Sequence, residues 1–221
     1  ERENIQIGQK MTLTVNGDVL AYVRPIHDGN EYKKIIPPVV CPLCGGDVVT
    51  YNDGIWLNCA NPSCPAKVRG KVYNYLSKMR IKGIAESSLN ALFEAGLLNN
   101  IQNLYELDLD AVAKLPGFGA KSAQALEDAV AARLEVYDYE FFGAWNWPTV
   151  GRTVMQTIFQ TMTWEDFVNG FNTKDRRSFI VWLSNIKGVG RVIAENIFLG
   201  MEVDNAMIAE VSQGWLTLIS S

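Results

Sequence analysis

Histidine is nearly absent from this 221-residue chain, which contains only His27. A single histidine excludes a metal site built on a histidine pair and argues against a histidine-based catalytic triad. Apolar runs stay below the roughly 18 residues of a membrane-spanning helix, so no membrane partner is expected. Positive charge is not in excess either, because 20 basic residues face 24 acidic ones and the net charge is −4. Binding of nucleic acid through bulk charge alone is therefore disfavoured.

Cysteine is missing from the whole chain except one short window. Cys41 and Cys44 form one close pair there, and Cys59 and Cys64 form another. Each pair can place two thiolates on one turn, and two pairs complete a tetrahedral shell for Zn²⁺. Four thiolates leave no open coordination position, so the predicted zinc is structural. Two disulfides in a secreted protein are the alternative.

The segment before the cysteines, residues 1–40, has the alternating pattern of short β-strands. Asn16-Gly17 is a hairpin signal in it, and Asn52-Asp53-Gly54 predicts a second hairpin between the cysteine pairs. Two or three strands do not form a stable sheet alone. We interpret residues 1–40 as part of a barrel whose other strands lie elsewhere. A small hairpin packed on the later domain is the alternative.

A helical pattern with a repeated turn follows the cysteines. The turns are Lys82–Ala85, Pro116–Gly119, Pro148–Gly151 and Lys187–Gly190, and their second residues are 34, 32 and 39 positions apart. Tetratricopeptide and ankyrin signatures are missing. A small–hydrophobic–glycine element before a helix is typical of the helix-hairpin-helix motif, in which the helix N-terminus faces a phosphate. An ordinary helix-turn-helix corner is the alternative for any single turn.

The candidate DNA-binding residues lie in these turns and just after them. They are Gly83, Gly117, Phe118, Gly119, Lys121, Ser122, Thr149, Val150, Gly151, Arg152, Gly188, Val189, Gly190 and Arg191. The first turn is followed by Glu86 instead of a cation, so we expect it to bind phosphate most weakly. If Gly119 and Gly190 hold positive φ, valine at either position should weaken binding.

Two other groups of residues have both a structural and a functional interpretation. The late aromatic residues, among them Trp145 and Trp147, can stack on bases, but their helical spacing favours packing in the core. The basic run from Lys67 to Lys82 is either a solvated helix face or a phosphate contact.

The order of these parts resembles the C-terminal half of bacterial or phage-type NAD-dependent DNA ligase. The resemblance covers nearly the whole chain, and its most specific stretches are Cys41–Gly45, Cys59–Lys67 and Leu115–Leu126. It implies a multi-domain, mainly α-helical protein with partial β-barrel strands. These parts are an OB-fold remainder (1–40), a four-cysteine zinc finger (41–66), four helix-hairpin-helix motifs (67–204) and a tail helix (205–221).

The resemblance also implies that the hairpins hold nicked double-stranded DNA by its backbone, in a cytoplasmic protein. The family's Lys-x-Asp-Gly adenylation motif is missing, since Ile26-His27 precedes Asp28-Gly29 and Tyr51-Asn52 precedes Asp53-Gly54. No catalytic residue is therefore expected in this chain, and it should be inactive alone. NAD and Mg²⁺ would be bound by an adenylating portion, either a separate subunit or an N-terminal segment. At the barrel strand, Leu20-Ala21 stand where the family usually has Ile-Pro.

Two other functions are compatible with the sequence. One is a stand-alone module that binds nicked or branched DNA without a role in ligation. The other is a protein-interaction scaffold that keeps the fold and not the DNA contacts, for which affinity for DNA should be negligible. Salt dependence of DNA binding separates this scaffold from a true phosphate-binding protein.

Overall fold

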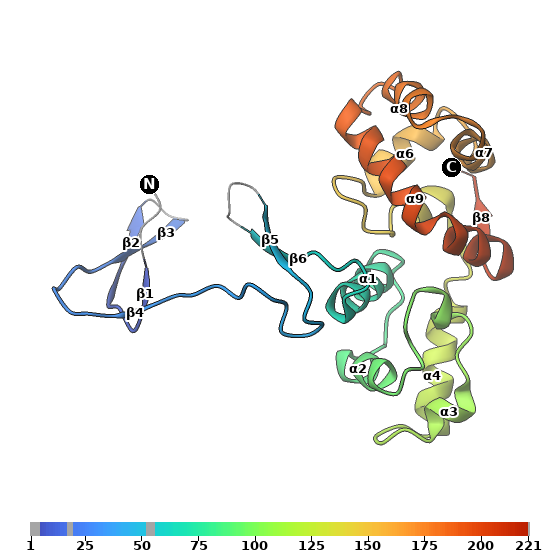
Figure 1. The fold of residues 1–221 in the computed structure, drawn as a ribbon. Coiled ribbons are helices and arrows are strands. Elements are labelled where there is room, and N and C mark those ends of the chain that lie inside the picture. The colour runs from blue at the N-terminus through green and yellow to red at the C-terminus, as the bar shows by residue number, and fades with distance from the viewer. Residues whose placement is uncertain (1–4, 17–19, 52–55, 221) are drawn as a thin grey trace. The chain divides into compact units, whose positions relative to one another are not determined.

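The computed structural model describes residues 5–16, 20–51 and 56–220. The chain divides into two compact units, Glu1–Cys64 and Pro65–Ser221. The first contains only short strands, and the second is mainly helical (Figure 1). Within the described residues, no helix is both long and apolar enough to span a membrane.

The strands before the cysteines form two separate two-stranded sheets. β2 (Met11–Asn16) pairs antiparallel with β3 (Leu20–Pro25), and β1 (Gln6–Ile7) pairs antiparallel with β4 (Lys33–Lys34). The predicted turn at Gly17 falls outside the described residues, but the strands on both sides of it agree with a hairpin. Residues 5–16 and 20–51 form no closed barrel, so the OB-fold remains a prediction.

A second hairpin separates the two cysteine pairs. β5 (Val48–Tyr51) pairs antiparallel with β6 (Trp56–Cys59), with Val48 opposite Cys59. These are the strands that the sequence predicts, and the tip between them lies outside the described residues. This hairpin therefore places Cys59 next to the strand that follows the first cysteine pair.

Nine α-helices and one 3-10 helix are described in the second unit. Their bounds are α1 Pro65–Lys78, α2 Glu86–Glu94, η1 Gln102–Leu104, α3 Leu109–Ala113, α4 Ala120–Ala131, α5 Asp138–Phe142, α6 Arg152–Phe159, α7 Trp164–Thr173, α8 Arg176–Ser184 and α9 Arg191–Gly214. Helices α2–α4 lie on one side of the unit, and α6–α9 lie on the other (Figure 1).

Side-chain caps fix where several of these helices begin. Asp108 accepts hydrogen bonds from the N–H groups of Asp110 and Ala111, and Thr163 accepts one from Asp166. Asp and Thr are among the residues preferred at the N-cap, so both starts follow from the local sequence. Asp175 caps α8 in the same way by accepting from the Ser178 N–H, because a carboxylate is a strong acceptor at the N-cap.

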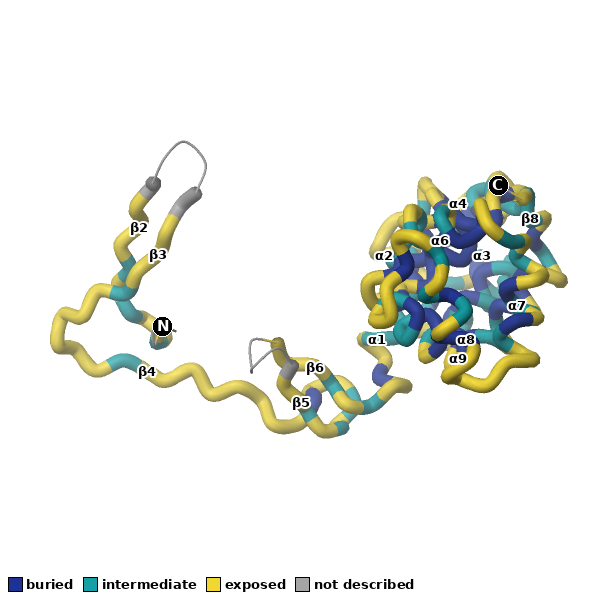
Figure 2. The backbone as a smooth tube through the Cα atoms, turned by 90° about the horizontal axis from the view of Figure 1, so that it is seen from above, coloured by how far each residue is buried: buried dark blue, intermediate teal, exposed yellow. Residues whose placement is uncertain are grey.

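The core of the second unit is rich in aromatic side chains. Phe141, Phe142, Phe167 and Phe179 are all at most 1% exposed, and their rings meet one another or further aromatic rings mainly edge to face. Buried residues are concentrated in this unit (Figure 2). Trp145 and Trp147 are 1% and 5% exposed, and Trp164 and Trp182 are partly buried against the same core, so these late aromatic residues serve packing.

The end of the chain departs from the predicted tail helix over 205–221. α9 runs without a break from Arg191 to Gly214, and Thr217–Ile219 form strand β8. The helix continues because no proline interrupts it and its buried positions keep helical spacing through Val211. β8 pairs in parallel with β7 (Glu135–Tyr137), the strand that follows α4.

Candidate metal centre and nucleic-acid interface

The four cysteines converge on one point of the first unit. All four sulfur atoms lie within 4.8 Å of one another, and none of the cysteines is in a disulfide. The Sγ atoms are 3.8 Å apart in Cys41 and Cys64 and 3.4 Å apart in Cys44 and Cys59. Tetrahedral zinc with Zn–S bonds of about 2.3 Å requires sulfurs about 3.8 Å apart. The cluster is therefore able to hold a metal such as zinc.

The surroundings of the cluster affect its thiols differently. The Cys41 N–H donates to the Gly46 carbonyl at 2.7 Å, and Gly45 closes the loop with φ +69°. The Gly46 N–H donates to the sulfur of Cys44 and lowers the pKa of that thiol to about 6. Burial instead raises the pKa of Cys59 to about 12. A Cβ on Gly46 would lie 3.1 Å from the Cβ of Asn61, so the loop fits closely around the four sulfurs.

Each of the four repeated turns has a left-handed residue at the same position. Gly83, Gly117 and Gly188 have φ of +89°, +84° and +94°, and Thr149 has +62° in the third turn. Glycine adopts this conformation without a Cβ penalty, whereas threonine does so only when its surroundings hold it. The repeat predicted from spacing is thus a repeat of backbone geometry.

The residue after the left-handed position is the apolar one. In three turns its N–H donates to the carbonyl three residues back, from Phe118 to Leu115, from Val150 to Trp147 and from Val189 to Ile186, at 2.9–3.1 Å. Val150 and Val189 are buried, and Phe118 is partly buried against the core. The turn is therefore anchored by one hydrogen bond and one apolar side chain.

The N-cap residue of the following helix is glycine in three turns. None of these three, Gly119, Gly151 and Gly190, has positive φ, so the positive φ considered from the sequence for Gly119 and Gly190 is not observed. No heavy atom lies within 4 Å of a Cβ built on any of the three. The left-handed conformation falls two residues earlier because the chain reverses there. The first turn has Ala85 as N-cap, so a methyl group occupies the place that the other turns leave open.

The turns are arranged in two pairs. Residues of the first and second turns, including Ile84 and Phe118, line one small cavity of about 120 Å³ together with Ser88 of α2 and Ser122 of α4. In the other pair, Asn196 of α9 donates to Thr149 Oγ1 at 3.1 Å. A Cβ on Gly188 would lie 3.9 Å from Thr157 of α6. Each turn thus lies beside the helix that follows the other turn of its pair.

The cations after the turns differ in their surroundings. Lys121 is exposed and forms no ion pair within the described residues. Arg191 is 82% exposed and pairs with Glu195 at 2.9 Å, one turn along the same helix. Arg152 pairs with the buried Glu140 at 2.5 Å and lies over the Tyr139 ring. Lys121 and Arg191 are therefore available to an outside anion, and Arg152 is partly engaged in the fold.

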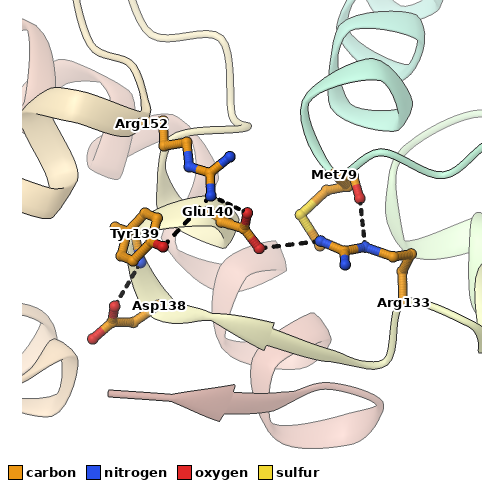
Figure 3. Close-up of polar contacts among 6 residues, drawn as sticks. All are labelled: Met79, Arg133, Asp138, Tyr139, Glu140 and Arg152. Atoms are coloured by element: carbon orange, nitrogen blue, oxygen red, sulfur yellow. Dashed lines mark hydrogen bonds and ion pairs between the residues drawn. The ribbon is translucent and has the colours of Figure 1, made fainter. Parts of the chain in front are cut away.

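Two polar networks, which the sequence does not predict, connect the hairpins. Glu140 also accepts from Arg133 at 3.1 Å, and Arg133 Nε donates to the Met79 carbonyl at 2.8 Å (Figure 3). In the second network, buried Asp204 pairs with Lys71 of α1 and accepts from Trp147 Nε1. In the sequence, each network is visible only as an acidic residue, Glu140 or Asp204, among apolar neighbours. Such a pattern does not reveal which distant residue the carboxylate binds.

Comparison with known proteins gives one family match and many similar proteins. Residues 76–130 match the family described as SAM-like helix-hairpin-helix tandem, which contains the first two turns. The chain is 33% identical over 164 residues to a DNA ligase of Nitratiruptor sp., covering 72% of this chain and 24% of that protein. It is 30% identical over 227 residues to a DNA ligase of Salinibacter ruber, an alignment that covers 99% of this chain and 32% of that protein. A DNA ligase of Rubrobacter xylanophilus is 28% identical, and the alignment covers 96% of this chain and 31% of that protein.

These matches confirm the resemblance to DNA ligase and, for the first two turns, the helix-hairpin-helix motif. They are consistent with the C-terminal half of an NAD-dependent enzyme. The chain spans about a quarter to a third of the length of these curated relatives.

Proposed function

We propose that this chain is the DNA-binding region of an NAD-dependent DNA ligase and holds nicked duplex DNA through its backbone phosphates. The observation that carries the proposal is the recurrence of one turn geometry four times, with open space in front of three N-cap glycines. Similarity to DNA ligases along 72–99% of the chain supports it independently.

The chemistry of the turns suits a phosphate and not a base. Behind each open glycine the first N–H groups of a helix have no partner in the helix, and the helix dipole adds positive potential there. A phosphate oxygen can approach these donors because Gly119 and Gly190 have no side chain. Lys121 and Arg191 add charge at the same places. Such contacts fix position on the duplex and carry no sequence information.

The sheets of the first unit have the properties of an incomplete barrel that needs further strands. Leu13 and Val23, which face each other across β2 and β3, are 65% and 53% exposed. Two-stranded sheets with exposed apolar residues are not stable alone. We propose that these strands complete an OB-fold with an adenylating portion, either a separate subunit or an N-terminal segment. That portion would supply the nucleophile and bind NAD and Mg²⁺, whereas Zn²⁺ would be held by the four cysteines of this chain.

Titration of a labelled nicked duplex at several salt concentrations tests DNA binding. The logarithm of the association constant should fall linearly with the logarithm of salt, by about 0.9 for each phosphate neutralised. Lys121→Ala and Arg191→Ala should each reduce the slope by about one, equally for duplexes of different sequence. Negligible binding without salt dependence would instead support the interaction scaffold.

Nick sealing tests the link to ligation. The chain should not seal a nick with NAD by itself, and it should do so when combined with a pre-adenylated portion that supplies the remaining OB-fold strands. A formed complex that binds nicked DNA and does not seal it would leave the stand-alone binding module as the better description.

A further inference from the structure

A group of cations lies where the end of α1 meets α5 and the start of α6, directly after the third turn. Ser77, Lys78 and Arg80 line a groove of about 220 Å³ together with Glu140, Gly143 and Arg152. Three of these side chains are cations and one is a carboxylate, although the chain as a whole carries a net charge of −4. The groove is therefore a locally positive site on an acidic protein.

Arg80 lies in this groove in an unfavourable backbone conformation. Its φ is +56°, and it follows α1 at the point where the Ile81 N–H donates to the Leu76 carbonyl at 2.9 Å. Glycine is the usual residue at this position of a helix C-terminus, because a Cβ is disfavoured there. The exposed Arg80 side chain has no ion-pair partner among the described residues.

The other wall of the groove is fixed by the Glu140 network. Glu140 holds Arg152 on one side and Arg133 on the other, and Arg133 also binds the carbonyl of Met79, directly before Arg80 (Figure 3). The backbone that carries Arg80 and the side chain of Arg152 are therefore tied to one another through Arg133 and Glu140. The Arg152 guanidinium and the backbone that carries Arg80 are positioned before any ligand arrives, which lowers the entropic cost of binding.

Gly143 allows the two walls to approach. A Cβ at this position would lie 2.7 Å from the backbone nitrogen of Arg152 and 2.8 Å from the Tyr139 carbonyl oxygen. Only glycine lets the start of α6 lie this close to α5. The groove is thus built by residues with specific structural requirements on both sides.

We infer that this groove is a further binding site for a backbone phosphate of duplex DNA, contacted by Lys78 and Arg80 together with Arg152, which directly follows the third turn. The inference rests on the proposed function, because it extends the surface that holds DNA beyond the hairpin turns. It also assigns a binding role to the end of the basic run from Lys67 to Lys82.

Arg80→Gly separates this role from a structural one. Glycine relieves the left-handed strain, so the variant should melt at the same temperature as the wild type or higher. Its Kd for a nicked duplex should nevertheless rise about tenfold, and its salt slope should fall by about one. Arg80→Lys keeps the charge and should lose much less affinity. Asn146→Gly is the matched control, since exposed Asn146 also has positive φ (+62°) and lies outside the groove; its Kd should not change.

The outcomes distinguish this inference from the proposed function. If wild-type protein binds nicked DNA and Lys121→Ala weakens it while Arg80→Gly does not, the groove is not a phosphate site and the proposed function stands. If the wild-type protein does not bind nicked duplex at any salt concentration, both are wrong.

Discussion

At the scale of single residues, two glycines of the same turn have different structural roles. Gly117 is left-handed and is needed for the shape of the turn, whereas Gly119 has extended backbone with open space beside it. Spacing in the sequence identifies both positions but does not tell which one has positive φ, because the chain reversal depends on the packing of the apolar residue between them.

Gly117→Ala should therefore destabilise the fold, and Gly119→Ala should not do so to the same degree. The expected loss for Gly117→Ala is roughly 1–2 kcal/mol, the cost of a Cβ in the left-handed region. Alanine at Gly119 should cost roughly 0.5–1 kcal/mol, since alanine is a poorer N-cap than glycine but meets no steric penalty in extended backbone. Urea unfolding of the two variants measures the difference. Equal losses would show that the turn is not held in the observed conformation.

Asp204 is a second residue with a specific structural role. It is 3% exposed and interacts with both Lys71 and Trp147 Nε1. Asp204→Ala leaves a half-buried cation and an indole N–H without their partner, and it should lower the free energy of unfolding by about 3 kcal/mol. Asp204→Asn keeps an acceptor for the indole and should lose less. A denaturation midpoint unchanged in Asp204→Ala would contradict this account.

At the scale of elements, periodicity and caps predict much of the helical unit. The turns, the caps at Asp108 and Thr163 and the stop at Gly96, which has φ +70°, follow from local chemistry. The continuous α9 and the β7–β8 pairing do not. They depend on close contacts between segments far apart in the chain, such as Gly200, where a Cβ would lie 2.4 Å from the Trp147 ring. The cluster of four cysteines is predictable because the cysteines are close in sequence, whereas the Arg80 groove is assembled from two distant segments.

The cap of α8 makes the stability of this helix depend on pH. Hydrogen bonds from Ser178, the backbone N–H first, hold the pKa of Asp175 below its usual range. A carboxylate with a lowered pKa in the folded state stabilises above its unfolded pKa of about 3.9, and this contribution is lost as the pH falls through the folded value. Asp175→Asn caps without titrating. The stability difference between the two proteins should shrink or reverse as the pH is lowered from 6 towards about 3. A difference that stays constant in urea melts over this range would be inconsistent with the cap.

At the scale of the whole molecule, the two units are stabilised in different ways. Within residues 5–14, 22–50 and 56–64, the only buried apolar side chains are Cys41 and Cys64, whereas the helical unit has a large aromatic core. A unit without an apolar core needs a metal or a partner to fold.

Removal of metal should therefore affect only the first unit. A chelator should abolish the NMR dispersion of residues 41–64 and leave the thermal transition of Pro65–Ser221 in place, and zinc should restore the dispersion at one ion per chain. The far-UV helical signal is the internal control. Loss of the helical transition on chelation, or full dispersion without metal, would contradict the proposed division of stability.

The central claim is that the hairpin turns hold DNA phosphates, and binding of nicked duplex by Gly119→Val and Gly190→Val tests it most directly. Gly214→Val is the matched control, because Gly214 also has open space and lies about 36 Å along α9 from Gly190. The account predicts that both turn variants keep the helical signal and bind at least tenfold more weakly, an effect of about 1.4 kcal/mol, with the control unchanged. Wild-type affinity in both turn variants would contradict it.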